Sequence, residues 1–387
     1  METETSTAGT AEPSSRSLVS AQAPVAAPAD DARQAAMTAA LDACERFVAG
    51  HGPQLPRAVL ARLAEEAGPE ERIDRYGAGA LITDFEHEVA GLLGKEAAVF
   101  MPSGTMAQQI ALRIWSERRG TANVAFHPTC HLALHERKGY EYLHGLRGVL
   151  VGDPRRMITL ADLEALHEPL AALLLELPQR EIGGQLPEWD DLWAQVIWAR
   201  ERDIALHMDG ARLWESGPYY DRTYAEIAGL FDTVYVSCYK GLGGIAGALL
   251  CGPEDFIAEA RVWQRRHGGN LVSLYPLVLS ARRGLRERLD RFPRYRRRAV
   301  SVARALSAIP GIAITPDPPQ TNMMHVYLRG DPHHLLDAAL DIARTERVAL
   351  FAALRPTDVP GWSMFELSLG DAVEALTDDE ISALFRR

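Results

Sequence analysis

The chain has 387 residues, of which 47% are hydrophobic and 24% charged, a composition typical of a globular protein. Its 41 basic and 52 acidic residues give a formal net charge of −11, which argues against a nucleic-acid or anionic-membrane surface. No apolar run approaches the roughly 18 residues of a membrane span. The four cysteines form no Cys-x-x-Cys pair and the N-terminus lacks a secretory pattern, so we expect a reduced, cytoplasmic location.

The N-terminal region divides into two parts by composition. Residues 1–32 are mainly Ala, Ser, Thr, Pro and acidic residues, which cannot bury enough apolar area to offset the entropy of ordering. We therefore predict a disordered tail there. Helical periodicity begins near Ala35 and returns over residues 56–67, and this predicts an N-terminal helical segment over residues 33–80.

Helices and short apolar strands alternate over residues 83–251. The pattern predicts strands at 97–101, 123–126, 173–176, 204–209, 233–237 and 247–251, and helices at 84–93, 105–118 and 188–202. Such alternation indicates a mostly parallel sheet with helices on both faces. We assign residues 81–275 to one large α/β domain.

The remaining chain is different in character. Residues 254–306 are helical and rich in arginine, which predicts a linking helix between two domains with a solvated basic face. After Pro310 the pattern predicts strands at 311–315, 323–328 and 365–369 and helices at 332–345 and 377–385. We therefore expect a small C-terminal α+β domain, and assign residues 276–387 to it and its linking helix.

A turn with glycine and hydroxyl groups follows the strand at 97–101 and opens a helix, with Ser103, Gly104 and Thr105 in it. Free backbone N–H groups and the positive end of the helix dipole suit a phosphate. The alternative is an ordinary N-cap turn.

Two further strands end in residues that carry chemistry. Asp209 ends the strand at 204–209, at the edge where open α/β sheets bind ligands, although a helix-capping role is the alternative. Lys240 follows the strand at 233–237, and glycines come directly after it. A buried lysine in such a loop can lose its proton and act as an amine nucleophile.

Together these three features predict a pyridoxal-phosphate site. Lys240 would form the Schiff base and the helix N-terminus would bind the phosphate. Asp209 would keep the pyridine nitrogen protonated and make the ring an electron sink.

The stretches LLGKEAAVFMPSGTMAQ, LHMDGARLWE and YKGLGGIAGALLCG resemble the threonine aldolase / β-eliminating lyase group of pyridoxal-phosphate enzymes, and the resemblance covers about residues 45–387. It implies the aspartate aminotransferase (type I) fold, a large domain with a mainly parallel sheet plus a small α+β domain. It also implies a homodimer or homotetramer with shared active sites. The residues that match cofactor-binding positions, or lie beside them, are Ser103, Gly104, Thr105, His131, Asp209, Arg212, Ser237, Lys240 and Arg266.

His131 matches a family histidine that stacks on the pyridine ring, and Glu136 also matches. We assign His131, Asp209 and Lys240 as the catalytic residues. The alternative for this segment is a zinc site of His127, Cys130, His131 and His135. No His-Glu-x-x-His order and no distant ligand set accompany them, and we predict no metal.

Substrate-handling residues of the family are missing from this chain. The resemblance implies a Ser-Asp-Thr near residues 47–51, a second histidine near 176–184 and an arginine near 364–367, and none is present. We expect Arg180, with Arg212, to bind the substrate carboxylate instead, because guanidinium forks suit carboxylates. Arg265 or Arg266 would replace the arginine that reaches the phosphate of a neighbouring subunit.

The predicted function is retro-aldol cleavage of a β-hydroxy-α-amino acid to glycine and an aldehyde. β-Elimination, transaldolase or aminotransferase chemistry on another amino acid, and a non-catalytic cofactor-binding scaffold, are the alternatives. The altered carboxylate clamp favours a substrate other than free L-threonine. An aromatic pocket for a bulkier side chain could be formed by Trp214, Tyr219, Tyr220 and Tyr239, and ordinary packing is the alternative for each of them.

Overall fold

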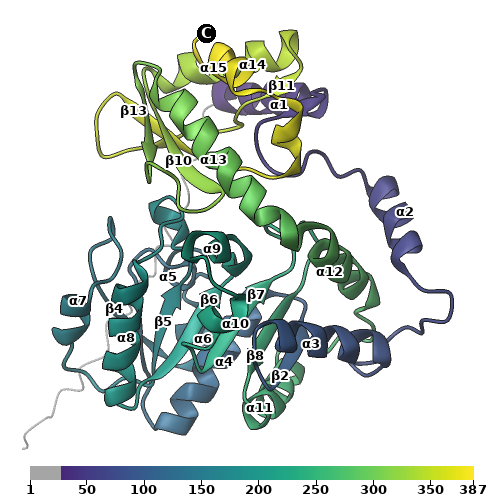
Figure 1. Ribbon diagram of the computed structural model, residues 1–387, viewed down its shortest axis with the longest axis vertical. Helices are drawn as coiled ribbons and strands as arrows, with labels where there is room; N and C mark the ends of the chain where they lie inside the picture. Colours follow the sequence, from purple (N-terminus) through teal and green to yellow (C-terminus); the bar gives the residue numbers. More distant parts are fainter. Residues whose placement is uncertain (1–27) are drawn as a thin grey trace, which may run out of the picture.

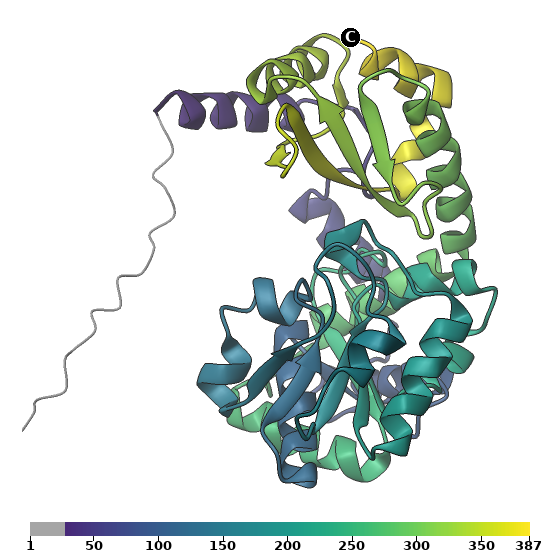
Figure 2. The ribbon, with the colours of Figure 1, turned by 90° about the vertical axis from the view of Figure 1, so that its left-hand side faces the viewer.

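The computed structural model describes residues 28–387, which form a large and a small domain joined along one side (Figure 1). Helix α13 (Phe292–Ser307) runs from one domain to the other (Figure 2). Its first turn packs into the core of the large domain through Phe292 and Tyr295, and its later turns pack into the core of the small domain through Val302 and Leu306. One helix therefore links the two cores.

The large domain is built on a seven-stranded sheet of order β2-β8-β7-β6-β5-β3-β4. Strands β7, β6, β5, β3 and β4 run parallel, whereas β8 is antiparallel to both of its neighbours. The strands are β2 (Ala97–Met101), β3 (Asn123–Phe126), β4 (Arg147–Leu150), β5 (Ala172–Glu176), β6 (Ala205–Gly210), β7 (Thr233–Ser237) and β8 (Ala248–Gly252). The carboxyl ends of β5, β6 and β7 consequently meet at one edge.

Helices cover both faces of this sheet, and a separate apolar core fills each side. Alternate residues of a strand enter different cores: Val99 and Met101 of β2 enter one, and Ala98 and Phe100 enter the other. The helices of the large domain are α3 (Ala80–Leu92), α4 (Gly104–Arg119), α5 (His131–Leu134), α6 (Gly139–His144), α7 (Leu160–Glu164), η1 (Arg180–Ile182), α8 (Trp189–Glu201), α9 (Leu213–Tyr220), α10 (Tyr224–Ala228), α11 (Glu254–Arg266), α12 (Tyr275–Arg288) and η2 (Leu289–Arg291).

The small domain contains an antiparallel sheet of order β12-β13-β10-β9. Its strands are β9 (Ile312–Thr315), β10 (Met323–Arg329), β12 (Arg355–Pro356) and β13 (Trp362–Ser368). Helices α14 (Pro332–Thr345) and α15 (Asp378–Phe385) pack on this domain, and η3 (Asp371–Ala375) lies between β13 and α15. A parallel pair of short strands, β1 (Arg46–Phe47) and β11 (Val348–Ala349), ties the N-terminal segment to the same domain.

The predicted N-terminal helical segment is split between the two domains. Helix α1 (Pro28–Asp42) packs through Met37 and Ala40 on α14 of the small domain, whereas α2 (Pro56–Glu66) lies against α12. Helix α1 begins at Pro28, inside the segment for which we predicted disorder, and the rest of that predicted tail lies outside the described residues. The domain boundaries drawn from the sequence remain predictions.

Most predicted elements lie within a few residues of their observed places. Several short elements were not predicted, among them strand β4, whose sequence RGVL is short and only partly apolar. The helical region from residue 254 is divided into α11, α12 and α13, with a break between Arg266 and Tyr275. No helix among residues 28–387 is long and apolar enough to cross a membrane.

Candidate functional site

The predicted site residues gather at the carboxyl edge of β5, β6 and β7. Glu176 is the last residue of β5 and lies opposite Asp209 of β6. Lys240 follows β7 by three residues. Asp209 and Glu176 are buried and Lys240 is half-buried, so the edge brings an amine and two carboxylates together away from bulk water.

Asp209 is held by two donors. The side chain of Gln108, on α4, donates to Asp209 Oδ2 at 2.9 Å, and the backbone N–H of Ala211 donates to Oδ1 at 3.1 Å. These contacts fix the orientation of a carboxylate that is 1% exposed. A fixed, buried carboxylate is suited to hold a proton on a ring nitrogen brought next to it.

Lys240 lies in a tight glycine loop. The N–H of Gly244 donates to the carbonyl of Cys238 at 2.9 Å, and a Cβ on Gly244 would lie 2.6 Å from that carbonyl oxygen. Burial lowers the pKa of the Lys240 ammonium, the charge of Asp209 opposes this shift, and the charge of Arg212 adds to it. The sequence prediction of a lysine that deprotonates readily is therefore consistent with its surroundings.

The N-terminus of α4 lies at the end of β2, where the phosphate turn was predicted. Ser103 is the N-cap residue but its side chain makes no capping hydrogen bond. A Cβ on Gly104 would lie 1.9 Å from the hydroxyl oxygen of Tyr235, so only glycine fits there without a shift. Uncapped N–H groups at the start of a 16-residue helix form an anion-binding end.

His131 begins α5 and is the outer member of a chain of hydrogen bonds. Its Nδ1 bonds to Glu136 Oε1 at 3.0 Å, and Gln109 donates to Glu136 Oε2 at 2.8 Å. This contact with Glu136 raises the pKa of the His131 imidazole, while partial burial opposes the rise. A carboxylate thus fixes the orientation of a half-buried imidazole and increases its basicity.

Glu176 anchors the loops around the edge of the sheet. It accepts hydrogen bonds from the backbone N–H groups of His131 and Arg180, each at 3.1 Å. Burial and the charge of Asp209 raise the pKa of the Glu176 carboxyl. Glu176 therefore connects the segment of His131 to that of Arg180.

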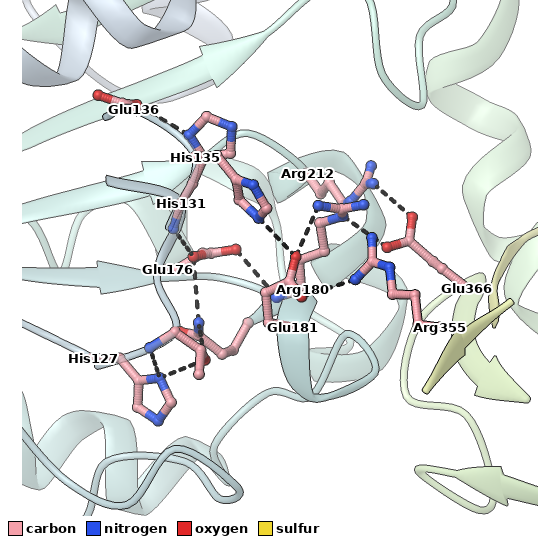
Figure 3. Close-up of polar contacts among 12 residues, drawn as sticks. His127, His131, His135, Glu136, Glu176, Arg180, Glu181, Arg212, Arg355 and Glu366 are labelled. Carbon is pink, nitrogen blue, oxygen red and sulfur yellow. Dashed lines mark hydrogen bonds and ion pairs between the residues drawn. The ribbon is translucent and has the colours of Figure 1, made fainter. Parts of the chain in front are cut away.

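Arg180 and Arg212 converge on one carboxylate of the small domain (Figure 3). Arg180 Nε donates to Glu366 Oε2 at 2.7 Å, and Arg212 Nη2 donates to Glu366 Oε1 at 3.2 Å. Arg180 also pairs with Glu181, which contacts His135 and Arg355. Arg180 is thus part of an interdomain ion-pair cluster.

Two other predicted cofactor contacts are engaged elsewhere in this chain. The Arg266 guanidinium lies over the ring of Trp263, 4.5 Å from its centroid. The hydroxyl of Ser237 accepts a hydrogen bond from the N–H of Tyr239 at 3.3 Å. A contact of Arg266 with a neighbouring subunit remains a prediction.

The histidines considered as zinc ligands have other partners. His127 Nε2 bonds to the carbonyls of Asp153 and Arg156, and its Nδ1 bonds to Thr129. Among residues 28–387 there is no group of three or more His, Cys, Asp or Glu placed to hold a metal ion.

The predicted aromatic pocket is not formed by these four residues together. Trp214 is 1% exposed and donates to the carbonyl of Ser237, so it belongs to the core. Tyr219 bonds to the side chain of Glu188, and Tyr220 to the carbonyl of Pro187. Packing and hydrogen bonding therefore account for these three aromatic side chains.

Sequence reasoning gave no role to Gln108, Gln109, Glu176 and Glu366. Gln108 and Gln109 lie one turn of α4 beyond the predicted phosphate turn. Because neighbouring residues of a helix point in different directions, Gln108 contacts Asp209 and Gln109 contacts Glu136. Glu176 lies at the carboxyl end of β5, as Asp209 does on β6, and this shared position could have identified Glu176 as a site residue from the sequence. Glu366 is far away in the sequence, and only the docking of the small domain brings it to the arginines.

Comparisons with known proteins identify the family of this chain. The family model described as Beta-eliminating lyase matches residues 63–330. A relative named as a probable low-specificity L-threonine aldolase from Arabidopsis thaliana is 29% identical over 259 residues, covering 64% of this chain and 72% of the relative.

Two solved structures are similar over most of their length. One, from Exiguobacterium sp. 255-15, is provisionally described as an aromatic amino acid beta-eliminating lyase/threonine aldolase; it is 42% identical with a TM-score of 0.87 and covers 91% of this chain and 99% of its own. The other, from Listeria monocytogenes EGD-E and provisionally described as an L-allo-threonine aldolase, is 40% identical with a TM-score of 0.88 and covers 92% and 98%. Since the family match spans more than half of the chain, this protein belongs to the beta-eliminating lyase family, a family of lyases, and has the type I fold of pyridoxal-phosphate enzymes.

Proposed function

We propose that this protein is a pyridoxal-phosphate-dependent lyase that cleaves a β-hydroxy-α-amino acid to glycine and an aldehyde. The observation that carries the proposal is the meeting of Lys240, Asp209 and the uncapped N-terminus of α4 at one edge of the sheet. These groups match the aldehyde, ring nitrogen and phosphate of the cofactor. Family membership and similarity to proteins named as threonine aldolases support the reaction class.

The residues present fit the cofactor. The Lys240 amine would attach it, Asp209 would hold the proton on its ring nitrogen, and Ser103, Gly104 and Thr105 would bind its phosphate. His131 would lie on the ring face. When bound, pyridoxal phosphate supplies an electron sink for the pair released when a bond to the substrate α-carbon breaks.

The protein's own groups then have distinct tasks. Arg180 and Arg212 bind and orient the substrate carboxylate, and this orientation selects which bond to the α-carbon breaks. His131 would accept the proton of the β-hydroxyl, and the hydrogen bond with Glu136, which raises the pKa of the imidazole, supports this role.

β-Elimination is the second candidate, because the matching family is described by that reaction. Incubation with a panel of L- and D-β-hydroxy amino acids, followed by measurement of glycine, aldehyde, 2-oxo acid and ammonia, separates the two. Equal amounts of glycine and aldehyde support the proposal. Ammonia and the 2-oxo acid that keeps the carbon chain of the substrate, without glycine, would replace it with β-elimination, and no product from any substrate would favour a cofactor-binding scaffold.

We also propose a homodimer or homotetramer with shared sites, in the cytoplasm. The exposed apolar residues Val262, on α11, and Val272, in the segment between α11 and α12, would be covered by contact with another copy. Four free, buried thiols suit a reducing compartment. An active monomer in light scattering would contradict the assembly.

A further inference from the structure

Glu366 occupies the arginine pair that the proposed function assigns to the substrate. It lies on β13, directly opposite His325 of β10, and its side chain is 17% exposed. Each of its carboxylate oxygens accepts a hydrogen bond from a different guanidinium, Arg180 at 2.7 Å and Arg212 at 3.2 Å (Figure 3). This is the arrangement expected for a bound carboxylate ligand.

A substrate carboxylate presents the same functional group as Glu366. Two carboxylates cannot take the same donors at once, and their like charges repel when they lie side by side. Arg212 also has a buried Nε that makes no hydrogen bond within the described residues. One nitrogen of each arginine, Arg180 Nε and Arg212 Nη2, already binds Glu366, so an incoming carboxylate competes with it for these donors.

Other carboxylates near the pair are weaker counter-charges. Glu181 is shared among Arg180, Arg355 and His135. Glu215 lies farther from Arg212, at 4.0 Å against 3.2 Å for Glu366. Glu366 is therefore the nearest of these carboxylates to Arg212 and the one that accepts its hydrogen bond, and a substrate carboxylate supplies the same charge to this arginine, which is 13% exposed.

We propose that Glu366 is a specificity-determining residue that occupies the carboxylate site in the free protein and is displaced by the carboxylate of the substrate. The inference rests on the proposed function, because that function assigns Arg180 and Arg212 to the carboxylate. The need to displace Glu366 lowers the affinity of the site for every carboxylate. It also disfavours neutral amides, since an amide cannot replace the negative charge of Glu366. It also breaks a contact between the domains, because Glu366 lies in the small domain and both arginines lie in the large one.

The test is Glu366→Gln in the holoenzyme, with binding measured by calorimetry. The probes are 3-hydroxybutyrate and 3-hydroxybutyramide, which lack the amino group and do not turn over. We expect 3-hydroxybutyrate to bind about tenfold more tightly than to the unsubstituted protein, because no competing anion fills the site. The gain for 3-hydroxybutyramide should be smaller, because an amide brings no charge to the two arginines. Glu374→Gln makes the same charge change at an exposed pair with Arg294 and should alter neither affinity.

Equal or weaker binding of 3-hydroxybutyrate by Glu366→Gln would overturn the inference, because Glu366 would then position the arginines. So would a gain of the same size in Glu374→Gln. If Glu366→Gln fails to fold, Glu366→Asp gives the same test, since the shorter side chain retains the charge but does not reach both guanidiniums. If the protein forms no glycine but Glu366→Gln binds 3-hydroxybutyrate more tightly, the proposed function fails and this inference stands.

Discussion

Asp209 and Glu176 lie directly opposite each other at the carboxyl ends of adjacent parallel strands. The two carboxylates have different donors: Gln108 and Ala211 hold Asp209, and backbone N–H groups of two loops hold Glu176. Burial and the charge of Asp209 raise the pKa of the Glu176 carboxyl. The two carboxylates therefore have different structural tasks: Asp209 is held by α4 and by the turn after its own strand, and Glu176 ties two loops to the edge of the sheet.

Asp209→Asn is expected to reduce turnover by about 10²-fold or more, because an amide cannot hold the proton on the cofactor ring. The fold should be retained, since asparagine has nearly the same shape. Asp232→Asn is the matched control, because Asp232 accepts from the N–H of Leu206 at the other end of the sheet. It should lower the melting temperature and leave turnover nearly unchanged. Near-normal turnover in Asp209→Asn would show that the carboxylate is only structural.

Glu136→Gln should shift the pH dependence of the reaction. The hydrogen bond with Glu136 raises the pKa of His131, so removal of the charge lowers that pKa. If neutral His131 accepts the β-hydroxyl proton, the ascending acidic limb of the rate profile moves to lower pH, by about one unit. Glu141→Gln, at an exposed pair with Lys138, should leave the limb in place. A shift to higher pH would exclude this role for His131.

Gly104→Ala should weaken cofactor binding and destabilise the fold. Its Cβ would lie 1.9 Å from the Tyr235 hydroxyl, so the N-terminus of α4 must move, at a cost of about 1–3 kcal/mol. Gly91→Ala provides the comparison within helix α3, because nothing lies within 4 Å of a Cβ there. It should stabilise the fold by about 0.5–1 kcal/mol. The measurements are denaturant unfolding and titration with pyridoxal phosphate; unchanged cofactor affinity in Gly104→Ala would contradict the phosphate assignment.

Acid should destabilise the protein through His207. This residue is fully buried and bonds to Thr233, and burial lowers its pKa to about 3. In the unfolded chain this histidine binds a proton below about pH 6.5, whereas in the folded protein it stays neutral down to about pH 3. The free energy of unfolding therefore has its full value above pH 6.5 and decreases as the pH falls towards 3, by about 2 kcal/mol at pH 5. The free energy of unfolding in urea should differ less between pH 7.5 and pH 5 in His207→Gln than in the unsubstituted protein. His167→Gln, at an exposed position, should show the same difference as the unsubstituted protein. If His207→Gln also shows that same difference, His207 is not the source of the acid sensitivity.

The local parts of the site were predictable from the sequence because each follows a strand. Ser103, Asp209 and Lys240 each end or follow an apolar strand, and parallel strands bring such ends to one edge. The contacts that depend on docking of the small domain were not predictable. Glu366 reaches Arg180 across 186 residues, and no pattern within either segment encodes that meeting. The sequence left pocket lining and ordinary packing open for the aromatic side chains near the motifs, and Trp214 fills the core.

Covalent attachment of the cofactor to Lys240 is the most direct test of the account. The chain is incubated with pyridoxal phosphate, reduced with borohydride, digested and analysed by mass spectrometry, with Lys240→Ala treated in parallel. The account predicts a phosphopyridoxyl label on the peptide that contains Lys240 and no stable label in the variant. A label on another lysine, or equal labelling of Lys240→Ala, would contradict it.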